Sequence, residues 1–310
     1  MSDAQLPEEL LREILSLLLS VSEADFCKFP DNGCPPWMSQ QPRGRQSYRP
    51  PPICDVLLVS KRWLRVGTPL LYESVHVWSP EHVKAIAAVL RANPGVGKAV
   101  RRLRIEGGCG KELYTIVKHA PNVDTLYICL HVKASEGIAG LRKALPLMRP
   151  QKLYWLHRGL TLNKAAVEAK ALLEKCIAEI WTSLRSINLY TFFNMTPEIA
   201  CTLSKAPALR ELIMDNNHKT REWIPRGFVR TIGQNRNLER ITVMGIISKS
   251  SFLQALENTN TPSSIVELFD FVETESDRSF HRMFCNRIAR QNEGDNETLF
   301  SDESHEDGEE

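Results

Sequence analysis

The sequence predicts an α/β protein with a short helical segment at the N-terminus, followed by a horseshoe-shaped solenoid in which helices alternate with parallel strands. Two observations support this fold class. Apolar triplets with the spacing L-x-x-L-x-L recur after residue 79, and each follows a stretch with helical patterning. The central residues of seven successive triplets lie 23, 27, 34, 25, 29 and 28 positions apart, and periods in this range are typical of repeat architectures.

The first predicted element is a helix that begins near Leu6 and Pro7. Proline suits the first turn, whose N–H groups lack helical partners, and Glu8 and Glu9 lie where the helix dipole favours acids. The apolar positions recur at helical spacing: Leu10, Leu11, Ile14, Leu15 and Leu18. This stripe is broad enough to require a covering surface.

A second helical segment follows at residues 55–66 and contains Val-Ser-Lys-Arg-Trp at Val59 to Trp63. Gly67 predicts a C-terminal stop, because glycine commonly ends helices. From Pro69 we expect a short helix and then a strand from Ser74 to Trp78.

Together, residues 6–18 and 55–78 resemble an F-box. The positions that fall on the family pattern are Leu6, Pro7, Ile14, Leu15, Leu58, Val59, Ser60, Arg62, Trp63, Pro69, Leu71 and Tyr72. The resemblance implies that residues 1–78 form a helical domain that docks the Skp-family adaptor of a cullin-RING ubiquitin ligase. The adaptor-binding residues it implies are Leu6, Pro7, Ile14, Leu15, Leu58, Val59 and Trp63. The alternative is an ordinary amphipathic helical hairpin.

A proline-rich insertion separates the two halves of this motif. Residues 27–53 hold seven of the 18 prolines of the chain, and proline removes backbone donors and disfavours helix in the residue before it. We therefore expect an exposed, disordered loop with polyproline character, made basic by Arg43, Arg45 and Arg49.

Residues 79–274 carry the repeats. The five clear triplets are Val100, Leu103, Ile105; Val123, Leu126, Ile128; Leu184, Ile187, Leu189; Leu209, Leu212, Met214; and Leu238, Ile241, Val243, with weaker copies around Leu153 and Phe269. The helices predicted between them are Pro80 to Asn93, Lys111 to His119, Glu136 to Leu147, Lys164 to Trp181, Pro197 to Lys205, Pro225 to Gln234 and Lys249 to Glu257.

This pattern resembles an irregular leucine-rich repeat, in which strands form a parallel sheet and helices cover its convex side. The asparagine ladder of that family is nearly missing, because only Asn217 falls at the expected place. The alternative is a compact α/β layer protein. A doubly wound nucleotide fold is disfavoured, since no GxGxxG or Walker sequence follows a strand.

Side chains that alternate with the buried triplets are predicted to face the concave side of the sheet. Tyrosine and arginine are frequent anchors of protein interfaces, so we expect a target protein to bind there. The candidate target-binding residues are Arg102, Arg104, Tyr127, Tyr154, Tyr190, Asp215 and Arg240, with His131, Asn188 and Glu211 on the same face. The alternative is that these positions are merely solvated.

Signatures of catalysis are absent from the sequence: it has no G-x-S-x-G and no H-E-x-x-H, and its histidines stand singly. We therefore expect no enzyme activity, no cofactor and no metal site; the spacing of Cys27, Cys34 and Cys54 matches no zinc template. A nucleic-acid-binding solenoid is a further alternative because Lys98, Arg101, Arg102 and Arg104 cluster, but no aromatic platform accompanies them.

The composition, 43% hydrophobic and 25% charged, is that of a globular protein. No signal peptide or membrane span is recognisable, and eight scattered cysteines favour free thiols in a reducing compartment. We expect a soluble protein of the cytoplasm, the nucleus or both.

The net charge of +2 conceals an asymmetric distribution. Residues 293–310 contain nine acids and no Lys or Arg, so the preceding 292 residues carry a net charge of +11. After a C-terminal helix at 275–292, we expect a disordered acidic tail that either solvates the protein or binds its basic body.

The functional prediction is an F-box protein whose repeats select a target for ubiquitin transfer by other subunits. The alternatives are a repeat scaffold whose hairpin serves only its own folding, or one that docks the adaptor without ubiquitination.

Overall fold

The computed structural model describes residues 6–27, 53–130, 132, 137–156, 163–189, 193–215, 218–245 and 249–272. The predicted proline-rich loop lies almost entirely outside these residues. So do the predicted C-terminal helix, the acidic tail and the positions His131, Tyr190 and Asn217.

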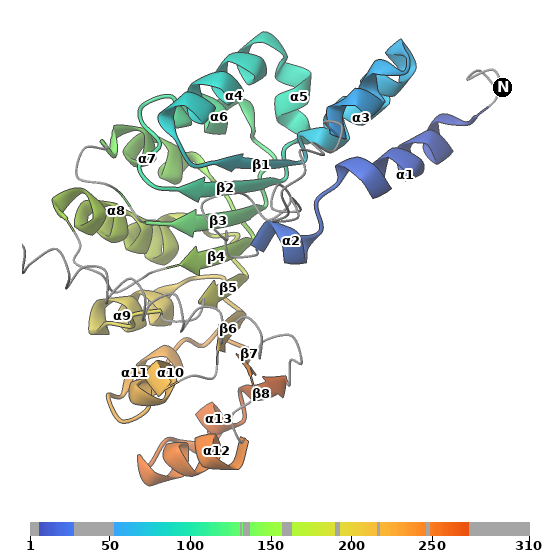
Figure 1. The fold of residues 1–310 in the computed structure, drawn as a ribbon. Helices are drawn as coiled ribbons and strands as arrows, with labels where there is room; N and C mark the ends of the chain where they lie inside the picture. Colours follow the sequence, from blue (N-terminus) through green and yellow to red (C-terminus); the bar gives the residue numbers. More distant parts are fainter. Residues whose placement is uncertain are drawn as a thin grey trace, which may run out of the picture.

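Eight parallel strands form one open sheet whose spatial order follows the chain, β1 to β8 (Figure 1). The strands are β1 Ser74–Val77, β2 Arg102–Glu106, β3 Thr125–Cys129, β4 Lys152–Leu156, β5 Ser186–Leu189, β6 Glu211–Asp215, β7 Arg240–Met244 and β8 Phe269–Val272. This confirms the predicted α/β solenoid, including the weaker copies at Leu153 and Phe269. The expected strand at Ser74 to Trp78 is the first strand of the sheet and pairs with β2.

Helices connect successive strands and lie along one side of the sheet, as Figure 1 shows. They are α4 Pro80–Ala92, α5 Pro94–Ala99, α6 Leu113–His119, α7 Ala139–Ala144, α8 Lys164–Lys175, α9 Pro197–Lys205, α10 His218–Trp223, α11 Phe228–Ile232, α12 Lys249–Asn258 and α13 Ser263–Val266. Short 3₁₀ and π turns, Leu145–Leu147 (η5) and Cys176–Ile180 (η6), end α7 and α8.

Capping side chains explain several of these helix starts. The side-chain oxygens of Ser79, Asn163 and Thr196 accept hydrogen bonds from backbone N–H groups three residues later. The helix predicted from Pro225 is wrong at its start, because α11 begins after Gly227, which has a φ of +75°. The helix predicted at residues 136–147 is also shorter and ends in a 3₁₀ turn.

A backbone hydrogen-bond ladder at the strand starts makes the repeats equivalent. In six successive repeats, the carbonyl before a strand accepts two N–H groups from the corresponding turn of the next repeat, at 2.7–3.1 Å. The accepting residues are Glu73, Arg101, Asp124, Gln151, Arg185 and Arg210. The six residues therefore occupy the same position in successive repeats.

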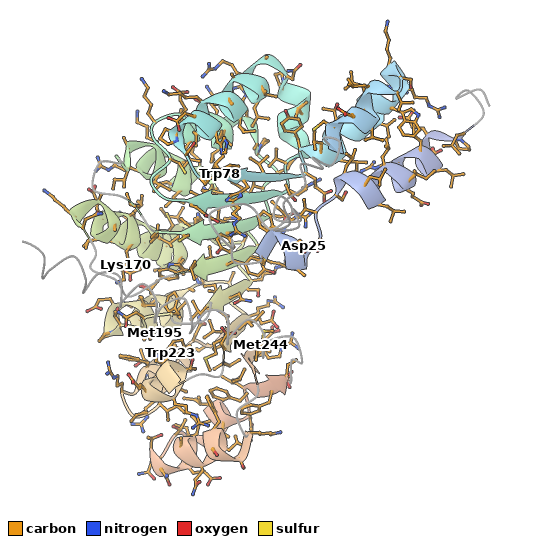
Figure 2. The ribbon with its side chains drawn as sticks, in the orientation of Figure 1. Asp25, Trp78, Lys170, Met195, Trp223 and Met244 are labelled. Carbon is orange, nitrogen blue, oxygen red and sulfur yellow. The ribbon has the colours of Figure 1, made fainter. Side chains whose placement is uncertain are left out.

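The core lies between the sheet and the helices. All fifteen residues of the five clear triplets are at most 6% exposed. Met195 and Trp223 lie on this helical side, away from Asp25 (Figure 2), and Phe193 packs with its ring centroid 5.0 Å from Trp155 and 6.4 Å from Trp223. Burial of this apolar surface is the main favourable term in folding.

The N-terminal elements are α1 Glu8–Leu19, α2 Glu23–Cys27, η4 Ile53–Leu58 and α3 Lys61–Leu71. We call α1, η4 and α3 the helical hairpin; α1 packs on α3, and both project from the sheet (Figure 1). Its core consists of Leu11, Leu15, Leu19, Leu57, Val66 and Leu70.

The predicted helix stop at Gly67 is wrong, because α3 continues through Gly67 and Pro69 to Leu71. Gly67 serves close packing instead: a Cβ atom there would lie 2.3 Å from Cδ2 of Leu57 and 3.0 Å from Cδ1 of Leu19. The glycine therefore allows α3 to approach η4 and α1 closely.

Candidate protein-docking surfaces

Exposed apolar side chains are concentrated on the helical hairpin. Among the described residues, ten large apolar side chains are classed as exposed, and seven of them belong to the hairpin or the turn before α3. They are Leu10, Ile14, Leu17, Leu18, Leu58, Val59 and Leu64. Exposed apolar residues scattered singly need no explanation, but a concentration of this kind makes the hairpin a candidate interaction site.

The α1 helix is apolar on two adjacent stripes. Leu11, Leu15 and Leu19 recur every four residues, face α3 and are at most 4% exposed. A second stripe of Leu10, Ile14, Leu17 and Leu18 follows the spacing i, i+4, i+7, i+8 and stays between 44% and 85% exposed. Folding of the hairpin therefore uses only one of the two stripes.

The structure divides the predicted adaptor-binding residues into two groups. Ile14, Leu58 and Val59 are exposed, as is Pro7, the residue that precedes α1. Leu15 is fully buried in the hairpin core, and Leu6 and Trp63 pack against that core with partial exposure. The prediction did not include Leu17 and Leu64, although Leu17 follows Ile14 and Leu10 at helical spacing.

The α2 helix covers part of the sheet face that was predicted to bind a target. Its Phe26 is completely buried against Tyr127 and Leu156, with Tyr154 and Cys129 packed alongside. The carboxylate of Glu23 accepts hydrogen bonds from the Tyr154 hydroxyl and from Nζ of Lys152, the latter at 3.0 Å. These contacts attach the N-terminal segment to β3 and β4.

Sequence reasoning missed α2, although its signal is present. The spacing Ser22-x-x-Asp25 is that of a capping box. In the structure, the backbone N–H of Asp25 donates to the Ser22 hydroxyl at 3.0 Å, and the hydroxyl donates to the Asp25 carboxylate at 2.7 Å.

Beneath α2, Arg104 is fully buried in a polar cluster. Its Nη1 donates to the carbonyl of Phe26 at 2.6 Å, and its Nε donates to Glu106 at 2.7 Å. Its guanidinium carbon lies 4.0 Å from the ring centroid of Tyr127. The same Glu106 carboxylate oxygen lies 3.2 Å from Nε2 of His76. A buried cation of this kind is stable only because it is paired and hydrogen-bonded.

Burial and charge shift the pKa values of this cluster. Burial lowers the pKa of His76 below its usual value of 6.5, although the hydrogen bond with Glu106 opposes this effect. Burial alone would raise the pKa of Glu106, but the contacts with His76 and Arg104 outweigh it and lower the pKa. Burial also raises the pKa of the Tyr127 phenol, and the hydrogen bond from Tyr154 lowers the pKa of Glu23.

The predicted target-binding residues consequently differ in accessibility. Arg104 and Tyr127 lie beneath α2 and are at most 1% exposed, so no partner reaches them while α2 is in place. Arg102 and Tyr154 are partly covered by the same helix, through Phe26 and Glu23. Asp215 is partly buried, whereas Arg240 is exposed and forms an ion pair with Glu211.

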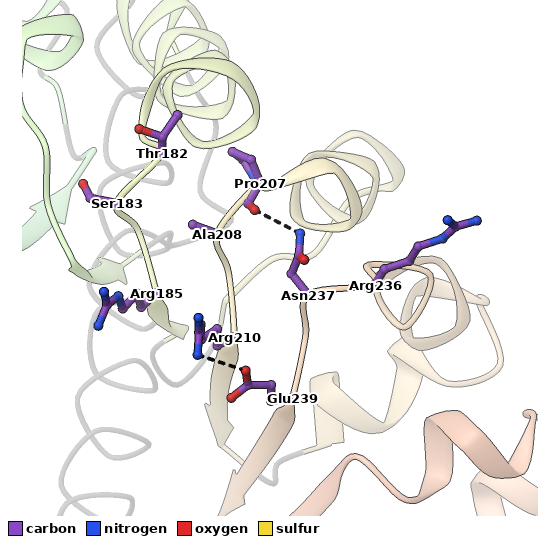
Figure 3. Close-up of a pocket in the computed structure, with 9 residues that line it drawn as sticks. All are labelled: Thr182, Ser183, Arg185, Pro207, Ala208, Arg210, Arg236, Asn237 and Glu239. Carbon is purple, nitrogen blue, oxygen red and sulfur yellow. Dashed lines mark hydrogen bonds and ion pairs between the residues drawn. The ribbon is translucent and has the colours of Figure 1, made fainter.

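Away from α2, the strand starts of β5 to β7 form two adjacent hollows rich in arginine. One hollow, of about 430 Å³, is shown in Figure 3. Its lining residues are Thr182, Ser183, Arg185, Pro207, Ala208, Arg210, Arg236, Asn237 and Glu239. The second, of about 570 Å³, shares Arg185, Arg210 and Glu239 and adds Gln151, Lys152, Ser186, Glu211 and Arg240. Sequence reasoning had included only Glu211 and Arg240 from this edge.

Two other sites were considered in the sequence, a zinc site and a basic cluster, and Cys34 of the first lies outside the described residues. In the described part of the chain, no three His, Cys, Asp or Glu side chains are grouped so that they could hold a metal ion. Cys176 is buried, which raises the pKa of its thiol to about 12. Of the predicted basic cluster, Arg104 is buried and Arg102 mostly buried, so the cluster is not a continuous basic surface.

The described helices also contain no segment long and apolar enough to cross a membrane. In the ranges that the structure covers, the chain combines two parts: a leucine-rich-repeat-like α/β solenoid and a helical hairpin with an exposed apolar stripe.

The chain was also compared with known proteins, by sequence and by structure. No protein-family model matches the sequence, and no curated protein matches it either. Among solved structures, the chain is similar to the leucine-rich repeat-containing protein LegL7 from Legionella pneumophila, with 16% identity and a TM-score of 0.36. The similarity covers 66% of this chain and 79% of that protein.

Proposed function

We propose that this protein is a non-catalytic adaptor. In this proposal, the helical hairpin docks a Skp-family adaptor of a cullin-RING ubiquitin ligase, and the repeats bind a target protein. The observation that carries the proposal is the exposed stripe of Leu10, Ile14, Leu17 and Leu18, which the hairpin does not use for its own folding. The F-box resemblance of residues 6–18 and 55–78 supplies the identity of the partner.

The attachment of α2 to the sheet supports this division of roles. An adaptor that presents a target to a second protein needs a fixed geometry between its two docking surfaces. Phe26 and Glu23 connect the segment after α1 to β3 and β4 through a buried contact and an ion pair. Rigid positioning of this kind reduces the ordering cost of assembly.

Co-purification with a Skp-family adaptor tests the proposal directly. Replacing Ile14 and Leu18 by glutamate places two charges on the exposed stripe without touching the hairpin core. We expect loss of co-purification, with an unchanged circular dichroism spectrum. Leu147→Glu with Val167→Glu is the matched control, because these side chains are 52% and 51% exposed and lie in η5 and α8, outside the hairpin. Undiminished adaptor binding by the Ile14 and Leu18 variant would show that the stripe is not the docking surface.

The alternative is a repeat scaffold whose hairpin serves only its own folding. The same experiment separates the two functions, since a scaffold would not co-purify with the adaptor in either form. If the unmodified chain fails to bind any Skp-family adaptor, the scaffold function is the one that remains.

A further inference from the structure

The arginine-rich edge over β5 to β7 has a regular geometry. Arg185 and Arg210 directly precede β5 and β6, and the backbone N–H of Arg210 donates to the carbonyl of Arg185 at 2.9 Å. Neighbouring strands are about 4.8 Å apart, so the two guanidinium groups project from adjacent positions on the solenoid. Both side chains are exposed.

Positive charge exceeds negative charge at this edge. The residues that line the two hollows include five cations, Lys152, Arg185, Arg210, Arg236 and Arg240, and two carboxylates, Glu211 and Glu239. Nη1 of Arg210 lies 3.2 Å from the Glu239 carboxylate. Nε and Nη2 of Arg240 both donate to Oε1 of Glu211, at 3.0 and 2.6 Å. Arg185 and Arg236 are left without an ion pair among the described residues (Figure 3).

The chain itself already places a carboxylate on the neighbouring cation. Lys152 occupies the register position beside Ser186, and its Nζ lies 3.0 Å from Glu23 of α2. At the start of β4 the sheet thus already binds an acidic side chain from a separate segment of the chain. Arg185 lines the same hollow as Lys152, one residue before Ser186 and at the repeat position of Gln151, and it has no ion pair among the described residues.

We propose that this edge, defined by Arg185, Arg210, Arg236 and Arg240, docks an acidic, carboxylate-rich segment of a partner polypeptide. Arginine suits carboxylates because its planar fork can donate two parallel hydrogen bonds. The inference rests on the proposed function and names the class of target that the repeats bind. It moves the docking site from the strands under α2 to the later repeats.

Nucleic acid is a poorer occupant of the same edge. Glu211 and Glu239 are interspersed among the cations and would repel a continuous phosphate backbone. The lining residues include no aromatic side chain on which a base could stack. A polypeptide with spaced carboxylates matches this alternation of charge better.

Fluorescence polarisation on the full-length chain tests the proposal. The probe is a labelled peptide of alternating glutamate and serine, and the matched peptide has glutamine in place of glutamate. We expect the acidic peptide to bind at low ionic strength, more weakly as salt rises, and the glutamine peptide not to bind. Arg185→Glu combined with Arg210→Glu should weaken binding about tenfold or more, because charge-assisted contacts become repulsive.

The control variant carries the same change in net charge elsewhere. Lys84→Glu with Lys164→Glu alters two exposed lysines on α4 and α8, and it should bind the acidic peptide within about twofold of the unmodified chain. Arg185→Glu alone is a second variant; it changes an exposed side chain and breaks no ion pair among the described residues, so we expect it to weaken peptide binding with an unchanged circular dichroism spectrum. Equal losses in the arginine and lysine variants, or no loss in either, would overturn the proposal. So would tighter binding of a DNA duplex that the arginine variant abolishes.

Adaptor co-purification of the same variants keeps this test separate from that of the proposed function. The arginine variant should lose the peptide and keep the adaptor. If the unmodified chain binds the acidic peptide but no adaptor, the ubiquitin-ligase function fails and the docking edge stands. If it binds the adaptor but not the peptide, the docking edge fails alone.

Discussion

The carbonyl oxygen of Phe26 accepts a hydrogen bond of 2.6 Å from Nη1 of Arg104, a residue 78 positions later in the chain. The Phe26 side chain is itself completely buried. The hydrogen bond and the buried ring join the N-terminal segment to the sheet and cover β2 and β3. The Phe26 carbonyl also gives the buried guanidinium of Arg104 one of its hydrogen-bond acceptors. A lone buried arginine would be unstable, so α2 and Arg104 stabilise each other.

Replacing Phe26 by alanine should lower the free energy of unfolding by about 3–5 kcal/mol, because it removes a fully buried aromatic side chain and leaves a cavity. Urea-induced unfolding followed by circular dichroism measures this change. Leu17→Ala, at a side chain that is 85% exposed, should change it by less than about 0.5 kcal/mol. A Phe26 variant as stable as the Leu17 variant would mean that α2 does not pack on the sheet in solution.

Leu15 and Ile14 are adjacent in α1 but should respond oppositely in two assays. Leu15→Ala should destabilise the protein by about 2–5 kcal/mol, since Leu15 is fully buried in the hairpin core. Ile14→Ala should have little effect on stability but should weaken co-purification of a Skp-family adaptor. Thermal unfolding and pull-down on the same preparations give both quantities. A stability loss of similar size in both variants would contradict the assignment of Ile14 to a bare stripe.

Gly67→Ala should be destabilising by about 1–3 kcal/mol, although alanine is the better helix former. The added methyl group would lie 2.3 Å from Leu57 and force the helices apart. Combining it with Leu57→Ala should recover part of the loss, which a denaturation series of the three variants would reveal. Gly95→Ala is the control, because a methyl group added there would meet no atom within 4 Å. Non-recovery in the double variant would contradict a steric cause.

The buried position of His76 predicts a pH dependence of stability. Because burial lowers its pKa in the folded protein below the usual 6.5, the unfolded chain binds the proton more readily. Stability should therefore fall as the pH drops below about 6.5, until the folded-state pKa is passed, and should be insensitive to this group above that range. Glu106, Arg104 and His82 are the charged or titratable groups that act on it.

His76→Gln should make stability less dependent on pH between about 8 and 5.5, because glutamine cannot be protonated there. Unfolding midpoints measured across this range test the effect against the unmodified chain. His119→Gln is the control for the remaining histidines, since His119 lies at the end of α6 outside the cluster. Parallel pH profiles of the His76 variant and the unmodified protein would contradict the role of burial.

The repeat fold could be predicted from the sequence because each repeat contains its own apolar triplet and its own helical spacing. The triplets combine a period of two within the strand with helical spacing between strands, and both periods are local. Helix ends were less accessible. Glycine is a common helix stop signal, but Gly67 lies inside α3 and allows close packing. Proline is a common helix start signal, but Pro225 precedes a turn and α11 begins only after Gly227.

The docking surfaces illustrate the same limit. Alternation along β2 and β3 placed Arg104 and Tyr127 on the concave face, which is where they lie. It contained no information that a helix about 80 to 100 residues earlier would cover them. Leu15 likewise shares the apolar character of Ile14, and only the position of α3 determines which of the two is buried.

The sequence by itself determined the alternation of helices and strands in the repeats, the buried triplet residues and the amphipathic character of α1, because these depend on spacing along one segment. Only the tertiary structure decided which apolar stripe of α1 remains bare, which arginines are buried and which line an open edge. The reason is physical: burial depends on a partner surface, and for Arg104 that surface comes from Phe26, 78 residues away. Arg185, which precedes β5, has no such covering segment among the described residues and is exposed to solvent.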